Sequence, residues 1–163
     1  MDVRKLIIKA KEIEEMAGER KIHFLNPEAE RVKKSLGDAV GLRNLGVHMV
    51  SVAPGKAATE YHKHYYEEEC IYVLSGEGLL EVEGEHFRFE MGDFVGFPAN
   101  TAAYSLVNDG TDLLVCLVFG QRLEQDVADY PKQGKRLYRN SGRWDLVDLE
   151  QVRDPRDRAP RGR

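Results

Sequence analysis

Short apolar runs recur from about residue 46 onward, and turn residues separate them. The runs are rich in Val, Ile, Leu, Phe and Tyr, and Gly, Pro, Asn or Asp stands between them. This spacing is expected of short antiparallel strands. The predicted strands are residues 47–52, 70–74, 79–82, 86–89, 94–97, 104–107 and 113–119. Glu83 and Gly84 predict a close hairpin, and the whole pattern predicts an antiparallel barrel or jelly roll.

The segments on either side of these strands have a different pattern of polar and apolar residues. Residues 1–20 mix charges with apolar residues and predict a short strand that passes into one helical turn, and residues 22–25 predict another short strand. A proline and a glycine in the positions that begin and end helices predict a helix over residues 27–36. The segment after residue 120 is polar and is expected to wrap back over the barrel. Its expected buried anchors are Tyr130, Leu137, Tyr138, Trp144 and Leu146.

A chain of 163 residues is long enough for one domain with a substantial core. We expect an N-terminal arm over residues 1–44, a barrel over 45–120, a C-terminal wrap over 121–152 and a flexible tail over 153–163. The tail is expected to be flexible because it is charged and rich in proline.

Composition and charge narrow the class of protein. An apolar fraction of 42% and a charged fraction of 32% are typical of a soluble globular chain. A net charge of −4 argues against a nucleic-acid partner. No apolar run approaches the ~20 residues of a membrane span, and the N-terminal apolar run is too short for a signal peptide. Cys70 and Cys116 lie in apolar runs and are expected to be free thiols, so a cytoplasmic location is predicted.

His62, His64 and Glu69 form the strongest candidate for chemistry. Side chains alternate along a strand, so histidines two residues apart point to the same side. A reversal over residues 65–68 would bring the Glu69 carboxylate beside them. Two nitrogens and one oxygen suit a divalent transition metal, which could be Fe, Mn, Ni, Cu or Zn. The alternative is a pocket in which the same side chains bind an organic group by hydrogen bonds.

The spacing of these residues resembles the first motif of the cupin superfamily. That motif runs here from Gly55 through His62, His64 and Glu69 to Gly76. The simplest reading of the glycines is that they occupy turns that need a positive φ.

A second cupin-like motif runs from Gly92 through Pro98 to Asn108. Gly92 and Pro98 are again interpreted as turn residues. This sequence departs from the usual motif at two positions. Asn100 stands where cupins usually have a glycine, and Tyr104 stands where they usually have a fourth metal ligand, a histidine.

The resemblance implies a double-stranded β-helix, the cupin jelly-roll barrel, in which His62, His64 and Glu69 hold a metal and Tyr104 lies opposite. Tyr104 could be a fourth ligand, a general acid or base, or a hydrogen-bonding neighbour of the ligands. It could instead be an aromatic plug in the barrel mouth. Cupins commonly form homodimers by exchanging terminal strands, so we expect a homodimer that buries the apolar residues of the N-terminal arm.

Other residues receive weaker interpretations. Glu67 and Glu68 are expected to form a solvated rim, although either could replace Glu69 as ligand or act as a base. His23, His48 and His86 are assigned no role. Residues 126–131 are similar to a segment that follows the barrel in some small bacterial cupins. They predict a loop across the barrel mouth or in a dimer contact, with two aspartates anchoring backbone amides.

Fold alone does not determine chemistry. The first functional hypothesis is a metal-dependent enzyme that acts on a small organic molecule by dioxygenase, isomerase or lyase chemistry. The second is a non-catalytic module that binds a small molecule or a metal.

Overall fold

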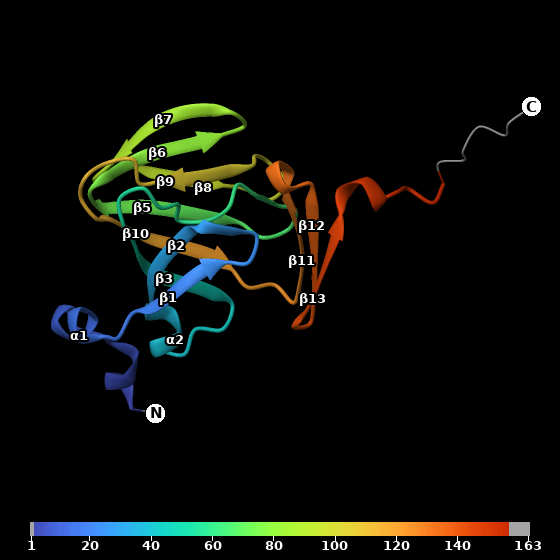
Figure 1. Cartoon of the computed structure of the whole chain (residues 1–163). Helices are drawn as coiled ribbons and strands as arrows, with labels where there is room; N and C mark the ends of the chain where they lie inside the picture. Colours follow the sequence, from blue (N-terminus) through green and yellow to red (C-terminus); the bar gives the residue numbers. More distant parts are fainter. Residues whose placement is uncertain (1, 157–163) are drawn as a thin grey trace, which may run out of the picture.

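A computed structural model describes residues 2–156 and shows a β-barrel with a small sheet at one end (Figure 1). The predicted flexible tail therefore lies outside the described residues from position 157 onward. The strands are β1 (Glu19–His23), β2 (Asn26–Ser35), β3 (Leu45–Val52), β4 (Lys63–His64), β5 (Glu69–Ser75), β6 (Glu77–Val82), β7 (Glu85–Glu90), β8 (Phe94–Phe97), β9 (Tyr104–Val107), β10 (Leu114–Gln121), β11 (Gln125–Tyr130), β12 (Lys135–Asn140) and β13 (Arg143–Asp148). The helices are η1 (Val3–Leu6), α1 (Ala10–Glu15), α2 (Leu36–Ala39), η2 (Pro131–Gln133) and η3 (Leu149–Gln151). None of the helices within residues 2–156 has the length and apolar character needed to cross a bilayer.

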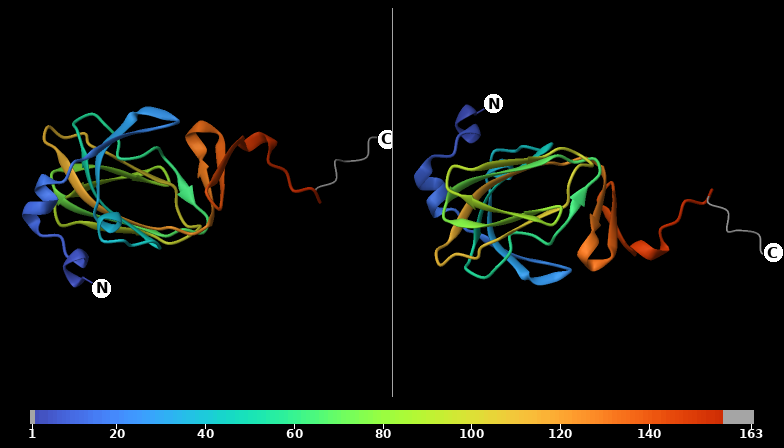
Figure 2. Two further views of the ribbon diagram at one scale, coloured as in Figure 1. Left: turned by 90° about the horizontal axis from the view of Figure 1, so that it is seen from below. Right: turned by 90° about the horizontal axis from the view of Figure 1, so that it is seen from above.

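Two antiparallel sheets form the barrel. The larger sheet has the order β1-β2-β3-β10-β5-β8, and the smaller one has the order β7-β6-β9. Figure 2 looks at these layers from below and from above. The core lies between the sheets, because its buried residues come from both. Examples are Val50, Ile71 and Cys116 from the larger sheet, and Leu80 and Leu106 from the smaller one.

This arrangement confirms the predicted all-β jelly-roll barrel and its seven predicted strands. The predicted hairpin at Glu83 and Gly84 is also present between β6 and β7. Both turn residues have positive φ, 50° and 83°, which matches the twist of the two strands that they join.

The predicted helix over residues 27–36 is wrong, because residues 27–35 lie in β2 and Leu36 begins the short helix α2. Glu, Ala, Arg and Lys favour helices in isolation. Here β2 pairs antiparallel with β1 on one side and with β3 on the other, and Ala29 is buried to 1% exposure. Ladder hydrogen bonds and burial therefore outweigh intrinsic propensity.

The predicted order of the N-terminal arm is also wrong. Instead of a strand followed by a helical turn, η1 and α1 precede β1. The Lys9 backbone amide donates to Glu12 Oε2 at 2.7 Å, the local bond that favours a helix start at this point. No residue of η1 or α1 is buried.

The C-terminal segment forms a second sheet at one end of the barrel. Its strand order is β13-β12-β11-β4, so β11 joins the barrel through the two-residue strand β4. Residues 126–131 are accordingly mostly strand and not the predicted loop. Tyr130 and Leu137 are buried as predicted. Tyr138, Trp144 and Leu146 are 36%, 56% and 41% exposed, so the prediction that they are buried anchors is wrong. Tyr138 lies on β12, and Trp144 and Leu146 lie on β13, the edge strand of this sheet.

Candidate metal centre

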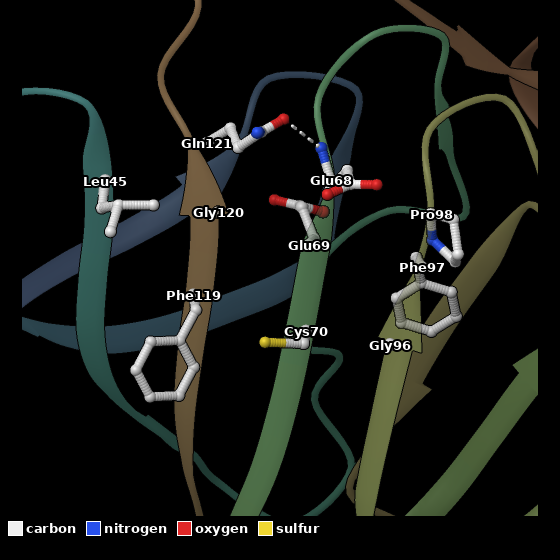
Figure 3. A pocket seen from close by; sticks show the side chains of 10 residues that line it. All are labelled: Leu45, Glu68, Glu69, Cys70, Gly96, Phe97, Pro98, Phe119, Gly120 and Gln121. Atoms are coloured by element: carbon white, nitrogen blue, oxygen red, sulfur yellow. Dashed lines mark hydrogen bonds between the residues drawn. The ribbon is translucent and has the colours of Figure 1, made fainter.

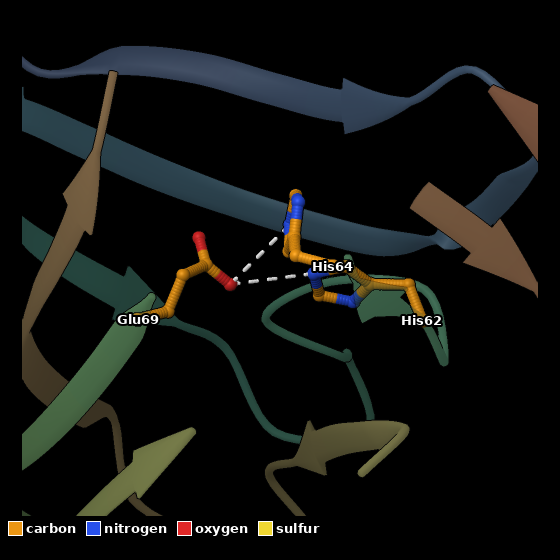
Figure 4. A group of neighbouring side chains, drawn as sticks. All are labelled: His62, His64 and Glu69. Carbon is orange, nitrogen blue, oxygen red and sulfur yellow. Dashed lines mark ion pairs between the residues drawn. The ribbon is translucent and has the colours of Figure 1, made fainter. Parts of the chain in front are cut away.

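Three side chains meet at the end of the barrel that carries β4 (Figure 4). His62 immediately precedes β4, His64 lies within it, and Glu69 is the first residue of β5. The two imidazoles point to the same side of an extended segment, as strand alternation requires. The turn over residues 65–68 reverses the chain, and the Glu69 carboxylate faces both rings.

The distances fit a metal ion. Glu69 Oε2 lies 3.4 Å from His62 Nε2 and 3.6 Å from His64 Nε2. One ligand atom from each of the three residues can be chosen so that all lie within 4.8 Å of one another. With metal bonds of about 2.1 Å, neighbouring ligand atoms lie about 3.0 to 3.4 Å apart. The two distances from Glu69 to the histidines are close to that range.

The outer nitrogen of each imidazole is already bound within the protein. His62 Nδ1 lies 2.8 Å from the carbonyl oxygen of Glu60, and His64 Nδ1 lies 2.5 Å from Asp126 Oδ2. A carbonyl oxygen can only accept, so Nδ1 of His62 donates to Glu60, and Nε2 is the nitrogen that faces Glu69. Metal-binding histidines have this arrangement.

Sequence reasoning missed the bond between Asp126 and His64. Asp126 Oδ2 binds His64, and Asp126 Oδ1 accepts from the backbone amides of Tyr66 and Glu67 at 3.1 and 3.3 Å. The prediction that an aspartate of this segment anchors backbone amides is therefore confirmed for Asp126. One carboxylate of the C-terminal sheet thus holds both a candidate ligand and the turn that leads to Glu69.

Glu67 does not belong to a solvated rim. Its side chain is buried, accepts from the Leu123 backbone amide at 2.7 Å and pairs with Arg139. His64, Glu67 and Asp126 also lie close together. Both of these carboxylates accept from protein donors, and these bonds hold the turn beside His64.

Tyr104 is paired directly with His62 across the barrel end. The two residues exchange backbone hydrogen bonds of 3.1 and 2.9 Å. The Tyr104 hydroxyl donates to Glu69 Oε2 at 2.5 Å, and its ring stacks on Phe97 at a centroid distance of 3.5 Å. Tyr104 therefore fills space in the barrel and at the same time fixes the carboxylate.

The charges of the site are set by these contacts. Burial alone raises the pKa of the Glu69 carboxyl, but the hydrogen bond with His62 and the charge of His64 outweigh burial and lower that pKa to about 2. Burial lowers the pKa of His64, yet the bond to Asp126 outweighs it and the pKa is raised. Burial and the nearby Glu69 carboxylate raise the pKa of Tyr104 well above its ordinary value, so its hydroxyl keeps its proton.

The four predicted turn residues lie around the barrel at the ends of strands. Gly55, Gly76 and Gly92 have positive φ values of 79°, 79° and 95°. At Gly76 a Cβ would also lie 2.6 Å from the Leu113 carbonyl oxygen. Pro98 opens the turn in which Asn100, at φ 56°, donates its backbone amide to the His64 carbonyl oxygen at 2.9 Å. Asparagine tolerates this left-handed conformation, where cupins usually have glycine.

Two hollows adjoin the centre. A cavity of about 10 Å³ lies among residues that include His64, Glu69 and Tyr104, and it is the size of one water molecule. A larger open groove of about 390 Å³ lies on the outer side of β10, β5 and β8 (Figure 3), with Cys70 and Phe119 among its lining residues. Cys70 alternates with the core residue Ile71 and so lies on the outer face. Glu69 of the candidate centre also lines the groove.

The comparisons with known proteins agree with this geometry. The family model of the cupin domain matches residues 48–120. The crystal structure of a protein from Acidithiobacillus ferrooxidans, provisionally assigned as a sugar phosphate isomerase, is 60% identical. The match covers 96% of this chain and 100% of that one, with a TM-score of 0.94. A sugar phosphate isomerase of the cupin superfamily from Silicibacter pomeroyi is 24% identical, with coverages of 87% and 92% and a TM-score of 0.75, and shows the shared fold.

A curated protein from Methanocaldococcus jannaschii, whose function is uncharacterised, is 34% identical over 70 residues. That match spans 43% of this chain and 46% of the archaeal protein, so just under half of that relative is covered. A double-stranded β-barrel with two histidines and a glutamate at one end defines a small-molecule enzyme or binding protein of the cupin type. The chain belongs to the cupin superfamily.

Proposed function

We propose that this protein is a metal-dependent enzyme that isomerises a small hydroxy-carbonyl compound of the sugar phosphate class. The metal part of the proposal rests on one observation. The inward nitrogens of His62 and His64 face a single oxygen of Glu69, while their outward nitrogens are held by Glu60 and Asp126. The isomerase part is supported by the 60% identical relative that bears this assignment over its full length.

His62, His64 and Glu69 would hold the ion, and the donor set suits Fe, Mn, Ni, Cu or Zn. A bound divalent ion would supply Lewis acidity toward a carbonyl or hydroxyl oxygen of the substrate. The protein's own residues set the geometry. Glu60 and Asp126 orient the imidazoles, and Tyr104 holds a proton on its hydroxyl against Glu69. We propose that Tyr104 is a positioning residue for Glu69 and not a fourth ligand, because a neutral phenol is a poor ligand.

The first test is elemental analysis of the untagged protein, purified without chelator, beside the His62→Ala/His64→Ala variant. The wild type is expected to carry close to one equivalent of a transition metal, and the variant is expected to lose it. His86→Ala is the matched control, because His86 lies on β7 in the other sheet, and it should retain the metal. Tyr104→Phe should also retain it, because Tyr104 is proposed to act through Glu69. Metal loss in Tyr104→Phe with the fold intact would instead favour direct coordination.

The same preparations are then incubated with a panel of aldose and ketose phosphates in deuterated water, and interconversion is followed by NMR. Conversion by the wild type, absent in the histidine double variant, is the expected result. A protein that binds metal but converts no member of the panel would contradict the isomerase assignment and favour the binding module.

We further propose that the protein is a homodimer. The large outer sheet face exposes Leu45, Tyr72, Leu74 and Phe94 by 37% to 64%, and the N-terminal arm exposes Val3, Leu6 and Ile7 by 53% to 60%. Tyr72 and Phe94 lie opposite each other on neighbouring strands, and exposed apolar patches on proteins commonly mark an interface. A second copy of the chain, as in the strand-exchanged dimers of cupins, would cover them.

A further inference from the structure

We propose that Arg31, with His23 and Tyr130, forms a subsite beside the metal centre for an oxyanion group of the substrate, phosphate or carboxylate. This inference deepens the proposed function, on which it rests, and assigns the residues that would recognise the charged end of the substrate. All three residues lie outside residues 48–120, the span that the cupin family model matches.

Arg31 is a partly buried cation without an anionic partner. Its Nη1 donates to the Ala58 carbonyl oxygen, and none of the ion pairs among residues 2–156 involves its guanidinium. A guanidinium has five N–H donors, so most of them are unused within the described protein. Burying a charge without a partner costs free energy. A ligand anion would offset that cost.

The Arg31 side chain is not fully enclosed by protein. Within residues 2–156, the sealed side-chain nitrogen and oxygen atoms that lack a partner are His48 Nδ1 and Arg139 Nε, and no atom of Arg31 is among them. Burial lowers the pKa of Arg31, and the Glu69 carboxylate opposes that effect, which is consistent with a guanidinium close to the metal centre. Its hydrogen-bond acceptor, Ala58, packs in the same core cluster as Tyr104.

His23 and Tyr130 connect Arg31 with the ligands. Arg31 of β2 lies opposite Lys21 of β1. Lys21 stands two residues before His23 in the sequence. The His23 ring lies 5.2 Å from the Tyr130 ring, which lies 6.0 Å from the His62 ring. His23 Nδ1 accepts from the Leu25 backbone amide at 3.2 Å, so the proton of the neutral ring is on Nε2. The group thus offers an imidazole N–H, a phenol O–H and guanidinium N–H groups.

This set of donors selects the chemistry of the ligand. A guanidinium binds carboxylate and phosphate oxygens through two parallel hydrogen bonds. Two neutral imidazoles and one carboxylate leave a divalent ion with one positive charge in excess. The nearby carboxylates of Asp126 and Glu60 accept hydrogen bonds from other groups, so Arg31 is the cation that still lacks a counterion. A neutral sugar would leave the guanidinium without a counterion, whereas an anionic substrate would pair with it.

The test is calorimetric titration of the full-length protein with inorganic phosphate and, separately, with acetate. Arg31→Gln removes the charge but keeps a donor for Ala58, and it is expected to weaken phosphate binding by about 10-fold to 100-fold. Arg20→Gln is the matched control, because it removes the same charge from the same hairpin at an exposed ion pair with Glu30. Arg20→Gln should change the affinity by less than about 2-fold. Acetate binding that depends on Arg31, without phosphate binding, would assign the subsite to a carboxylate.

Two further measurements test whether Arg31 itself binds the anion. In the His62→Ala/His64→Ala variant, phosphate binding should persist, since the metal ligands are not its proposed partners. In the wild type, phosphate should shift the NMR resonance of the Arg31 side-chain Nε–H more than that of Arg20, and this readout needs no variant to fold. Phosphate binding that survives in Arg31→Gln, or no binding of either anion up to about 50 mM, would overturn the subsite. Metal analysis of the same samples separates that outcome from failure of the metal proposal.

Discussion

Asp126 shows how a single side chain links two parts of the chain. It lies on β11, outside the matched cupin span, yet it binds His64 and two backbone amides of the turn before Glu69. Residues that hold the outer nitrogen of a metal-binding imidazole fix the ring and raise its basicity. The candidate centre is therefore complete only when the C-terminal sheet has docked.

Asp126→Asn is expected to weaken metal binding by about 10-fold to 100-fold, since an amide is a poorer acceptor for His64 than a carboxylate. The measurement is a metal titration against a competing chelator. A double-mutant cycle distinguishes an effect through His64 from a general effect on the structure. In a His64→Ala background, Asp126→Asn should have no further effect on the metal affinity. An equal loss in both backgrounds would contradict the positioning role.

The C-terminal sheet is stabilised as an element by a second buried aspartate. Asp129 pairs with Arg136 of β12 at 2.6 Å and accepts from the Tyr65 hydroxyl at 2.8 Å. Burial raises the pKa of the Asp129 carboxyl, but the bonds from Arg136 and Tyr65 outweigh burial and keep that pKa below its ordinary value. A carboxyl whose pKa is depressed in the folded state stabilises the protein above its unfolded pKa, and the contribution is lost as the pH falls through the folded value.

Asp129→Asn should therefore lower the free energy of unfolding at pH 7 by about 1 to 3 kcal/mol. The difference from the wild type should shrink as the pH falls below about 4. Urea unfolding at several pH values measures both effects. Asp145→Asn is the control on β13, where the pair with Arg143 is exposed, and it should change stability by less than about 0.5 kcal/mol at any pH. A difference for Asp129→Asn that does not depend on pH would contradict the electrostatic explanation.

At the scale of the whole molecule, the barrel leaves apolar surface uncovered on one side. Phe94 on β8 is 64% exposed and lies opposite Tyr72 of β5, which is 39% exposed. The N-terminal arm projects beyond the barrel with its apolar residues unburied (Figures 1 and 2). Both the face of β5 and β8 and the N-terminal arm therefore expose apolar side chains that a second copy of the chain would bury.

Light scattering coupled to size-exclusion chromatography should give a mass of about twice 18.6 kDa for the wild type. Phe94→Asp is expected to shift the protein toward the monomer, because it places a charge within the proposed interface. Phe87→Asp is the matched control, since Phe87 is 47% exposed on β7 of the other sheet, and it should leave the mass unchanged. A monomeric wild type would refute the dimer.

The sequence alone determined the barrel and the candidate ligands. Strand alternation is a local property, so the spacing of His62 and His64 was enough to place both rings on one side. Turn residues likewise marked the barrel strands. What only the tertiary structure decided depends on contacts between distant segments. Residues 27–35 became a strand because β1 and β3 flank them, against their local helix propensity.

The surroundings of the ligands were decided in the same way. Asp126 reaches His64, Tyr104 reaches Glu69, and Arg31 reaches Ala58, and each contact joins residues far apart in the chain. No local periodicity encodes such pairs, because they depend on how the sheets pack and on which buried donors need an acceptor. The sequence therefore specified the candidate ligands, and the packed fold determined which groups orient them and which charges surround them.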